Sequence, residues 1–212
     1  MGNKIISVKK CYLCEGEKFS LLKEISEKPD KETEFDLKKD NYLRKIKVCN
    51  LCDVYINDHS YDLDKIYSEQ YNSKTYLNDI ETNFERIRNL SFSKSDNKQR
   101  VDRIIKYLKK NGNFVNAMKL LDIGSGLGVF PAEIKLHNLK VSCIDPSLVS
   151  IKHLRKNVKV DHAIHGEFLG LQIKERYDLI TLNKVLEHVK NPIAMLSKAK
   201  KLLKPGGLIY IE

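Results

Sequence analysis

The sequence predicts an α/β protein in which a doubly wound parallel sheet follows a small zinc-ribbon-like domain. Three observations support this fold class. Five short apolar runs alternate with helix-length segments after Met118, a glycine-rich turn follows the first run, and two Cys-x-x-Cys pairs lie near the N-terminus. The chain has 212 residues and 42% of them are hydrophobic, so it can bury at least one core.

The chain is basic, but its composition is not typical of a protein that recognises nucleic acid. There are 38 Lys and Arg residues against 28 Asp and Glu residues, which gives a formal net charge of +10. Only 7 of the basic residues are Arg, the residue that grips phosphate and guanine with two parallel hydrogen bonds. We therefore expect a solvated lysine surface, and nucleic acid is the less favoured partner.

No apolar run approaches the roughly 20 residues that a membrane-spanning helix needs. The N-terminus lacks the apolar stretch of a secretory signal, because charge returns at Lys9 and Lys10. These features predict a cytoplasmic protein without a membrane partner. The sequence does not indicate the oligomeric state.

Residues 1–62 are expected to form a zinc-binding domain. Two Cys-x-x-Cys pairs are separated by 34 residues, and such pairs can together hold one tetrahedral ion with four thiolates. The segment has few apolar residues, so a metal would supply stability that its core cannot. The alternatives are two disulfides or a redox-active cysteine pair. Disulfides are typical of an oxidising compartment, and a redox motif normally has a single Cys-x-x-Cys pair. The expected zinc ligands are Cys11, Cys14, Cys49 and Cys52.

Residues 63–115 are expected to form a helical linker and cap. Val101, Ile104, Ile105 and Leu108 recur at helical spacing and form one apolar face, and Gly112 can end that helix.

Residues 116–212 are expected to form the parallel sheet domain. Its predicted strands are residues 119–123, 140–144, 160–164, 177–182 and 208–211. The first strand runs into glycines at positions 124, 126 and 128, with Asp122 inside the strand end and Ser125 within the turn. Such a turn lets a ligand lie against bare backbone at a helix N-terminus.

Asp145 ends the second predicted strand, 17 residues after Gly128. A carboxylate at that place can accept hydrogen bonds from both ribose hydroxyls of an adenosine ligand. The structural alternative is that Asp145 caps the following helix, expected from Ser147 to Asn157. A nicotinamide cofactor would use a similar turn, but its glycine spacing is G-x-G-x-x-G rather than the G-x-G-x-G found here.

These residues resemble the class I S-adenosylmethionine-dependent methyltransferases, which have a Rossmann-like fold. The stretch from Asp122 to Gly128 resembles their first motif, and Asp145 with Pro146 their second. Gly166-Glu167-Phe168 is similar to the segment that brackets the adenine. Residues 177–189, which contain Asn183, resemble the family's fourth-strand motif. Residues 202–208 resemble the segment that leads into its fifth strand.

The resemblance implies cofactor contacts at Asp122, Gly124, Ser125, Gly126, Gly128, Asp145, Pro146, Glu167, Phe168 and Asn183. When the four cysteines are included, the sequence resembles in particular the methyltransferases that have an N-terminal zinc-binding domain. That group includes enzymes that methylate nucleotide-linked sugars at carbon. In that group the segment 64–76, with Tyr67, Tyr71 and Tyr76, would line the pocket or pack as a helix face.

The family normally has seven strands, whereas this sequence ends within its fifth predicted strand. We therefore expect an S-adenosylmethionine-binding domain that is incomplete at its C-terminus, with five strands in the order 3-2-1-4-5. Residues 208–211 would then form an exposed edge.

The expected function is methyl transfer from S-adenosylmethionine to a small molecule, with a nucleotide-linked sugar as one acceptor. His188, after the fourth strand, is the candidate catalytic base if the acceptor must lose a proton, although a structural role at a helix entry is the alternative. A second hypothesis is an RNA or protein methyltransferase whose zinc domain holds the polymer. A third is a binding module without activity, against which the intact glycines and acids argue.

Overall fold

The computed structural model describes residues 8–29, 42–59 and 79–212. The chain divides into two compact units, residues 1–75 and 76–212. The expected segment 64–76, with Tyr67, Tyr71 and Tyr76, lies outside the described residues. The finer division into domains 1–62, 63–115 and 116–212 stays a prediction.

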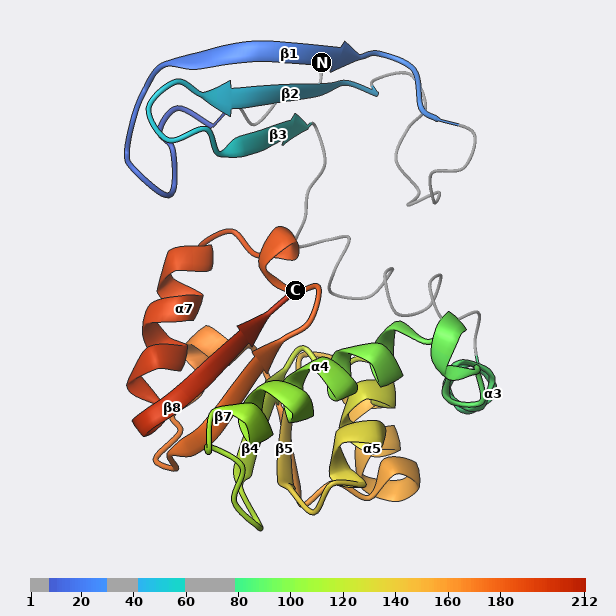
Figure 1. Cartoon of the computed structure of the whole chain (residues 1–212). Helices are drawn as coiled ribbons and strands as arrows, with labels where there is room; N and C mark the ends of the chain where they lie inside the picture. Colours follow the sequence, from blue (N-terminus) through green and yellow to red (C-terminus); the bar gives the residue numbers. More distant parts are fainter. Residues whose placement is uncertain (1–7, 30–41, 60–78) are drawn as a thin grey trace. The chain divides into compact units, whose positions relative to one another are not determined.

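The first unit contains a three-stranded antiparallel sheet in the order β1-β2-β3 (Figure 1). Its fully buried apolar side chains, among the described residues, are only Cys11, Cys49 and Ile56. The buried Asp58 carboxylate pairs with Lys47 and accepts a hydrogen bond from the Val8 amide at 3.0 Å. The strands are β1 (Phe19–Ile25), β2 (Arg44–Cys49) and β3 (Tyr55–His59).

The second unit contains a five-stranded parallel sheet, which confirms the expected fold class (Figure 1). Its order, β6-β5-β4-β7-β8, is the predicted order 3-2-1-4-5, and β8 pairs only with β7 among the described residues. All four strand pairs are parallel, so their carboxyl ends meet at one edge. The strands are β4 (Lys119–Ile123), β5 (Lys140–Asp145), β6 (His162–His165), β7 (Tyr177–Leu182) and β8 (Leu203–Ile211).

Helices cover both faces of this sheet. Leu120 of β4 joins the core on the face of α3, α4, α5 and α6, while its neighbour Leu121 joins the core on the face of α7. This alternation is the two-residue period of a strand that is buried on both sides. The α-helices are α3 (Ile80–Arg88), α4 (Asp96–Lys110), α5 (Val129–Lys135), α6 (Leu148–His153) and α7 (Pro192–Lys201).

Short helical turns complete the second unit. A π-helical turn extends α6, and 3-10 turns precede α4 or follow β6 and β7. They are η3 (Phe92–Lys94), η4 (Leu154–Val158), η5 (Phe168–Gly170) and η6 (Leu186–His188).

Two predicted strands begin at different residues in the structure. β6 begins at His162 rather than at residue 160, because the Val160 amide still bonds the Leu154 carbonyl at the end of η4. β8 begins at Leu203 rather than at residue 208, since the chain pairs with Tyr177 before a register irregularity. The apolar face predicted for α4 is confirmed: all four of its residues are buried.

An ionic network joins α4 to the end of β8. Glu212 accepts hydrogen bonds from Arg100 and Arg103, both at 2.6 Å, and from the Tyr210 hydroxyl at 2.5 Å. The Arg100 side chain is only 4% exposed. These contacts lower the pKa of Glu212 to about 2, the hydrogen bond from Arg100 being the largest cause.

Among the residues that the structure describes, no helix is both long and apolar enough to cross a bilayer.

We expect Gly128→Ala to destabilise the second unit by about 2–3 kcal/mol. Gly128 has φ +74°, and an added Cβ would lie 2.7 Å from Leu154 Cδ2 and 2.9 Å from Val158 Cγ2. Gly112→Ala is the matched control, because Gly112 has φ +68° with nothing within 4 Å of the added atom. Urea unfolding should therefore show a smaller decrease in the free energy of unfolding for Gly112→Ala than for Gly128→Ala. Equal decreases would contradict the crowding around Gly128.

We expect Glu212→Gln to destabilise the protein at pH 7 and to have little effect near pH 2. The pKa of Glu212 is depressed in the folded state, so its contribution is full above the unfolded value near 4.5 and is lost as the pH falls toward 2. Asp102→Asn, which removes a surface pair with Lys106 on the same helix, is the control. Thermal unfolding across this pH range tests the prediction. A difference in melting temperature between wild type and Glu212→Gln that stays the same at acid pH would refute it.

Candidate cofactor site and metal centre

The turn after β4 is built from glycines in left-handed backbone conformations. Gly124, Gly126 and Gly128 have φ of +72°, +51° and +74°. A Cβ atom on Gly124 would lie 2.7 Å from Val185 Cγ2, so the turn also passes close to the segment after β7. Only glycine permits both features without strain, and the result is bare backbone at the N-terminus of α5.

Asp145 joins this turn to the loop after β5. Its Oδ2 accepts a hydrogen bond from the Gly126 amide and its Oδ1 accepts one from the Ser147 amide, both at 2.8 Å. Burial raises the pKa of Asp145, and the two amide donors oppose that shift. Each carboxylate oxygen can still accept one more donor, as a pair of ribose hydroxyls would require.

The alternative role for Asp145, as cap of the next helix, belongs to another residue. Ser147 is the N-cap of α6, and its hydroxyl accepts a hydrogen bond from the Ser150 amide at 3.3 Å. Asp145 holds the cap residue in place and is not itself the cap.

Asp122 lies beneath the turn and gathers polar groups from β7. Its Oδ1 accepts hydrogen bonds from Thr181 Oγ1 at 2.6 Å and from Asn183 Nδ2 at 3.1 Å. Burial raises the pKa of Asp122 to about 6, against the opposing effect of these hydrogen bonds. The Ser125 hydroxyl donates to the Asp122 carbonyl at 3.1 Å, so the turn is also tied to the strand end.

The Asn183 Oδ1 atom is buried and has no hydrogen-bond partner within the described part of the chain. A buried acceptor without a donor costs free energy unless a ligand or water satisfies it. With the Asp122 carboxylate beside it, this edge suits a ligand with a cationic donor. The residues present therefore fit S-adenosylmethionine, whose amino group is such a donor.

The segment after β6 lies next to Asp145. The Gly166 amide donates to the Asp145 carbonyl at 3.1 Å, and Glu167 is exposed. Phe168 is only 4% exposed and its ring packs in the core on the α7 face, so it can face a ligand only through its backbone. The carbonyl of Pro146 contacts His165 Nε2 at 2.9 Å, which closes this loop.

His188 ends η6, directly after the carboxyl end of β7. Its side chain is 36% exposed, and its Nε2 lies 3.9 Å from Glu187 Oε1. Its amide donates to the Val185 carbonyl at 3.0 Å, as expected for a residue that shapes the entry to this turn.

The structure thus places the predicted cofactor residues at one edge of the sheet. Asp122 and Asp145 lie near the carboxyl ends of β4 and β5, and the others lie on the segments that follow β4, β5, β6 and β7. Sequence analysis missed Thr181 and Ser147. Thr181 lies within the fourth-strand motif 177–189 and Ser147 directly follows Pro146, but nothing in the sequence indicates that Thr181 bonds Asp122, 59 positions away.

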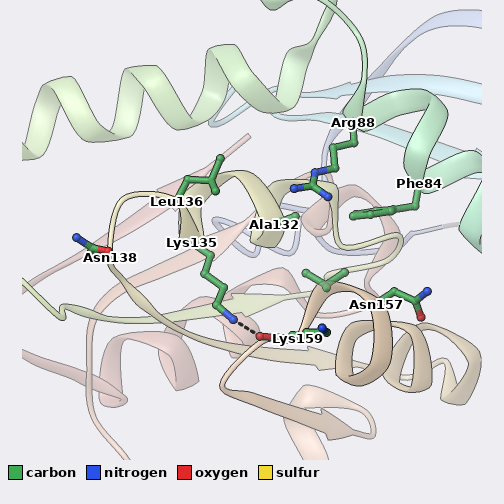
Figure 2. A pocket seen from close by; sticks show the side chains of 9 residues that line it. Phe84, Arg88, Ala132, Lys135, Leu136, Asn138, Asn157 and Lys159 are labelled. Atoms are coloured by element: carbon green, nitrogen blue, oxygen red, sulfur yellow. Dashed lines mark hydrogen bonds between the residues drawn. The ribbon is translucent and has the colours of Figure 1, made fainter.

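A separate hollow of about 470 Å³ is lined in part by Ala132 and Lys135 of α5 and by Leu136, the C-cap of this helix (Figure 2). Arg88, Lys135 and Lys159 line it, at or just after the C-terminal ends of α3, α5 and η4. Cations at such positions offset the partial negative charge of free helix carbonyls, and Lys135 donates to the Lys159 carbonyl. None of the predicted cofactor residues lines this hollow.

The four predicted metal ligands come together in the first unit. Their sulfur atoms all lie within 4.8 Å of one another, with Cys11 to Cys52 at 3.6 Å and Cys14 to Cys49 at 3.5 Å. A disulfide requires about 2.05 Å, whereas four sulfurs about 2.3 Å from one zinc ion stand roughly 3.8 Å apart. The arrangement therefore fits a tetrahedral ion.

The two cysteine pairs lie on equivalent backbone turns. The Glu15 amide donates to the Cys11 carbonyl at 2.8 Å, and the Asp53 amide donates to the Cys49 carbonyl at 3.0 Å. Glu15 and Asp53 have φ of +60° and +57°, positions that favour glycine. Two non-glycine residues in this conformation imply that surrounding interactions enforce the turns.

Comparison with known proteins shows similarity to methyltransferases. Ubiquinone biosynthesis O-methyltransferase from Pasteurella multocida is 26% identical over 124 residues, covering 51% of each chain. The enzyme of the same name from Pseudomonas putida is 33% identical over 100 residues, covering 44% of this chain and 43% of its own. The chain spans about half the length of the curated relatives it matches.

A solved structure shares the fold. The plantazolicin methyltransferase BpumL, crystallised with a monoazolic desmethylPZN analogue and S-adenosylhomocysteine, superposes with a TM-score of 0.53 at 23% identity. The match covers 70% of this chain and 55% of that one. Residues 90–212, more than half of the chain, match the family model described as a methyltransferase domain. The protein belongs to the methyltransferase-domain family.

Proposed function

We propose that the protein transfers a methyl group from S-adenosylmethionine to a small molecule. The observation that carries this proposal is the junction of the glycine turn, Asp145 and Asn183 at the carboxyl edge of a sheet whose chain belongs to the methyltransferase-domain family. The crevice outside the carboxyl ends of parallel strands is where ligands bind in open α/β sheets.

In this proposal each polar group has one task. The carboxylate of Asp145 accepts the ribose hydroxyls, the backbone of the glycine turn lies against the ligand, and Asn183 Oδ1 accepts a hydrogen bond from the amino group of the ligand. The exposed Glu167 and the backbone of Phe168 lie beside the adenine. The cofactor supplies an electrophilic methyl group on a sulfonium, and the protein mainly has to align it with the acceptor.

His188 is the proposed general base for an acceptor that must lose a proton, such as a hydroxyl or a carbon next to a carbonyl. Its position after β7 is at the same edge as the cofactor residues. The curated relatives named above are O-methyltransferases by name, which favours an acceptor hydroxyl. A nucleotide-linked sugar stays within the proposal as one acceptor class.

The second candidate is a polymer substrate held by the zinc-binding unit. The described part of that unit, residues 8–29 and 42–59, has eight basic and six acidic side chains. This balance gives little attraction for RNA, whose binding depends on neutralised phosphates. We therefore favour the small molecule.

We also propose that Cys11, Cys14, Cys49 and Cys52 hold one structural zinc ion. The supporting observations are the clustered sulfurs and the very small core of the first unit. Four protein ligands leave no open position, so this metal would stabilise the fold and take no part in methyl transfer.

Protein purified without chelator should contain about one zinc ion per chain. Cys52→Ser should abolish most of the bound metal and unfold the first unit, because binding free energy is folding free energy in such small domains. Cys143→Ser is the control, since Cys143 is buried in β5 and remote in sequence from both pairs. A disulfide within the cluster, found by mass spectrometry, would refute the assignment. So would metal analysis that finds as much zinc in Cys52→Ser as in wild type.

Asp145→Ala should weaken S-adenosylhomocysteine binding by about 2–3 kcal/mol, because two buried hydroxyls lose their acceptor. Isothermal titration calorimetry measures the dissociation constant, and circular dichroism checks that the variant folds. Asp102→Ala removes a surface acid of α4 and should leave the affinity unchanged. An unchanged dissociation constant in Asp145→Ala would reject the ribose assignment.

The function itself is tested by calorimetric titration with S-adenosylhomocysteine, followed by an acceptor screen with labelled S-adenosylmethionine. Quinol-like hydroxyls, nucleotide sugars and RNA form its three arms. Transfer to RNA that falls steeply with salt would favour the polymer hypothesis. Absence of cofactor binding would reject the proposal.

A further inference from the structure

Lys198 of α7 makes an unusual set of contacts with the turn η5. Its ammonium group donates to the carbonyl oxygens of Phe168 at 2.5 Å, of Leu169 at 3.0 Å, and of Leu171. An ammonium group has three protons, so these three bonds use its full donor capacity. The three carbonyls belong to one stretch of four residues, which Lys198 therefore clamps as a unit.

The same ammonium lies 5.0 Å from the centre of the Phe168 ring. The face of an aromatic ring carries partial negative charge and attracts a cation at this distance. No carboxylate lies within ion-pair distance of Lys198 among the residues that the structure describes. Burial lowers the pKa of Lys198. The lysine is therefore committed to the turn and its aromatic residue, and not to an acid.

The clamped stretch is continuous with the proposed adenine segment. Gly166 is tied to β5 through its hydrogen bond to the Asp145 carbonyl. It has φ +141°, and an added Cβ would lie 3.0 Å from the Leu171 side chain, so the two ends of the segment pack on each other. Glu167 lies between the hydrogen bond to β5 and the stretch that Lys198 clamps, and Phe168 is the first residue of that stretch.

We propose that Lys198 is a positioning residue for recognition of the adenine base. It holds residues 168–171 against α7, so that the Glu167 carboxylate and the Phe168 backbone stay at the cofactor edge. This inference rests on the proposed function. Lys198 acts through the turn and does not itself touch the cofactor, and its contacts to carbonyls 27 to 30 positions away cannot be predicted from the sequence.

If Lys198 positions the adenine segment, its loss should reduce the preference of the site for adenine over hypoxanthine. The exocyclic amine of adenine is a donor that hypoxanthine lacks, and a correctly placed carboxylate or carbonyl reads that difference. A displaced turn would lose this discrimination. A general loss of stability would instead weaken adenine and hypoxanthine ligands to the same degree.

The test measures dissociation constants for S-adenosylhomocysteine, 5′-methylthioadenosine and 5′-methylthioinosine by calorimetry. Lys198→Met keeps the apolar stem and removes all three donors. We expect it to bind both adenosine ligands about tenfold more weakly, as for the loss of one charged hydrogen-bonding group, and to reduce the adenosine-to-inosine affinity ratio. Lys198→Arg should restore part of the ratio. Lys200→Met, an exposed lysine on the same helix, should match wild type.

The outcomes separate the inference from the proposed function. Wild-type protein that does not bind S-adenosylhomocysteine rejects both. Wild-type binding with unchanged affinities and ratio in Lys198→Met overturns the inference alone, as does equal weakening of the adenosine and inosine ligands. If Lys198→Met does not fold, Lys198→Gln, which keeps two N–H donors and loses the charge, is measured instead. An unchanged ratio in that variant also overturns the inference.

Discussion

The carboxylate of Asp145 is the interaction on which the candidate site depends. It accepts the amide of Gly126 from one loop and the amide of Ser147 from another, so it fixes the glycine turn relative to the start of α6. These bonds form only because β4 and β5 are parallel neighbours that end at the same edge. A buried carboxylate of this kind is stable because backbone donors compensate its lost hydration.

A second layer of polar contacts supports that edge from below. Asp122 binds Thr181 and Asn183 of the neighbouring strand region and so aligns β4 with β7. Its raised pKa shows the cost of burying a carboxylate with only neutral donors. The unpaired Asn183 oxygen indicates that this set is incomplete in the chain by itself. Sites that bind charged ligands commonly carry such unsatisfied polarity until the ligand arrives.

The two units achieve stability in different ways. The second unit buries two apolar layers on opposite faces of its sheet, and its α4 helix is further joined to β8 through Glu212. The first unit has almost no apolar core among its described residues, and two of its three buried apolar side chains are Cys11 and Cys49 of the sulfur cluster. Small domains with this composition depend on a metal or a disulfide, and the sulfur separations agree with the metal.

The sequence by itself determined the features that depend on residues close together in the chain. The strand and helix periods, the glycine turn and the cysteine pairs all follow from spacings of a few residues. The order of the parallel strands is the one that the resemblance to the methyltransferases implies, and the structure confirms it. Tertiary structure alone decided which distant groups meet. Thr181 reaches Asp122 from 59 positions away, Lys198 reaches the carbonyls of residues 168–171, and Arg100 reaches Glu212 across 112 positions. Such partners cannot be read from sequence, because the geometry of the packed sheet, and not chain proximity, selects among many equivalent donors and acceptors.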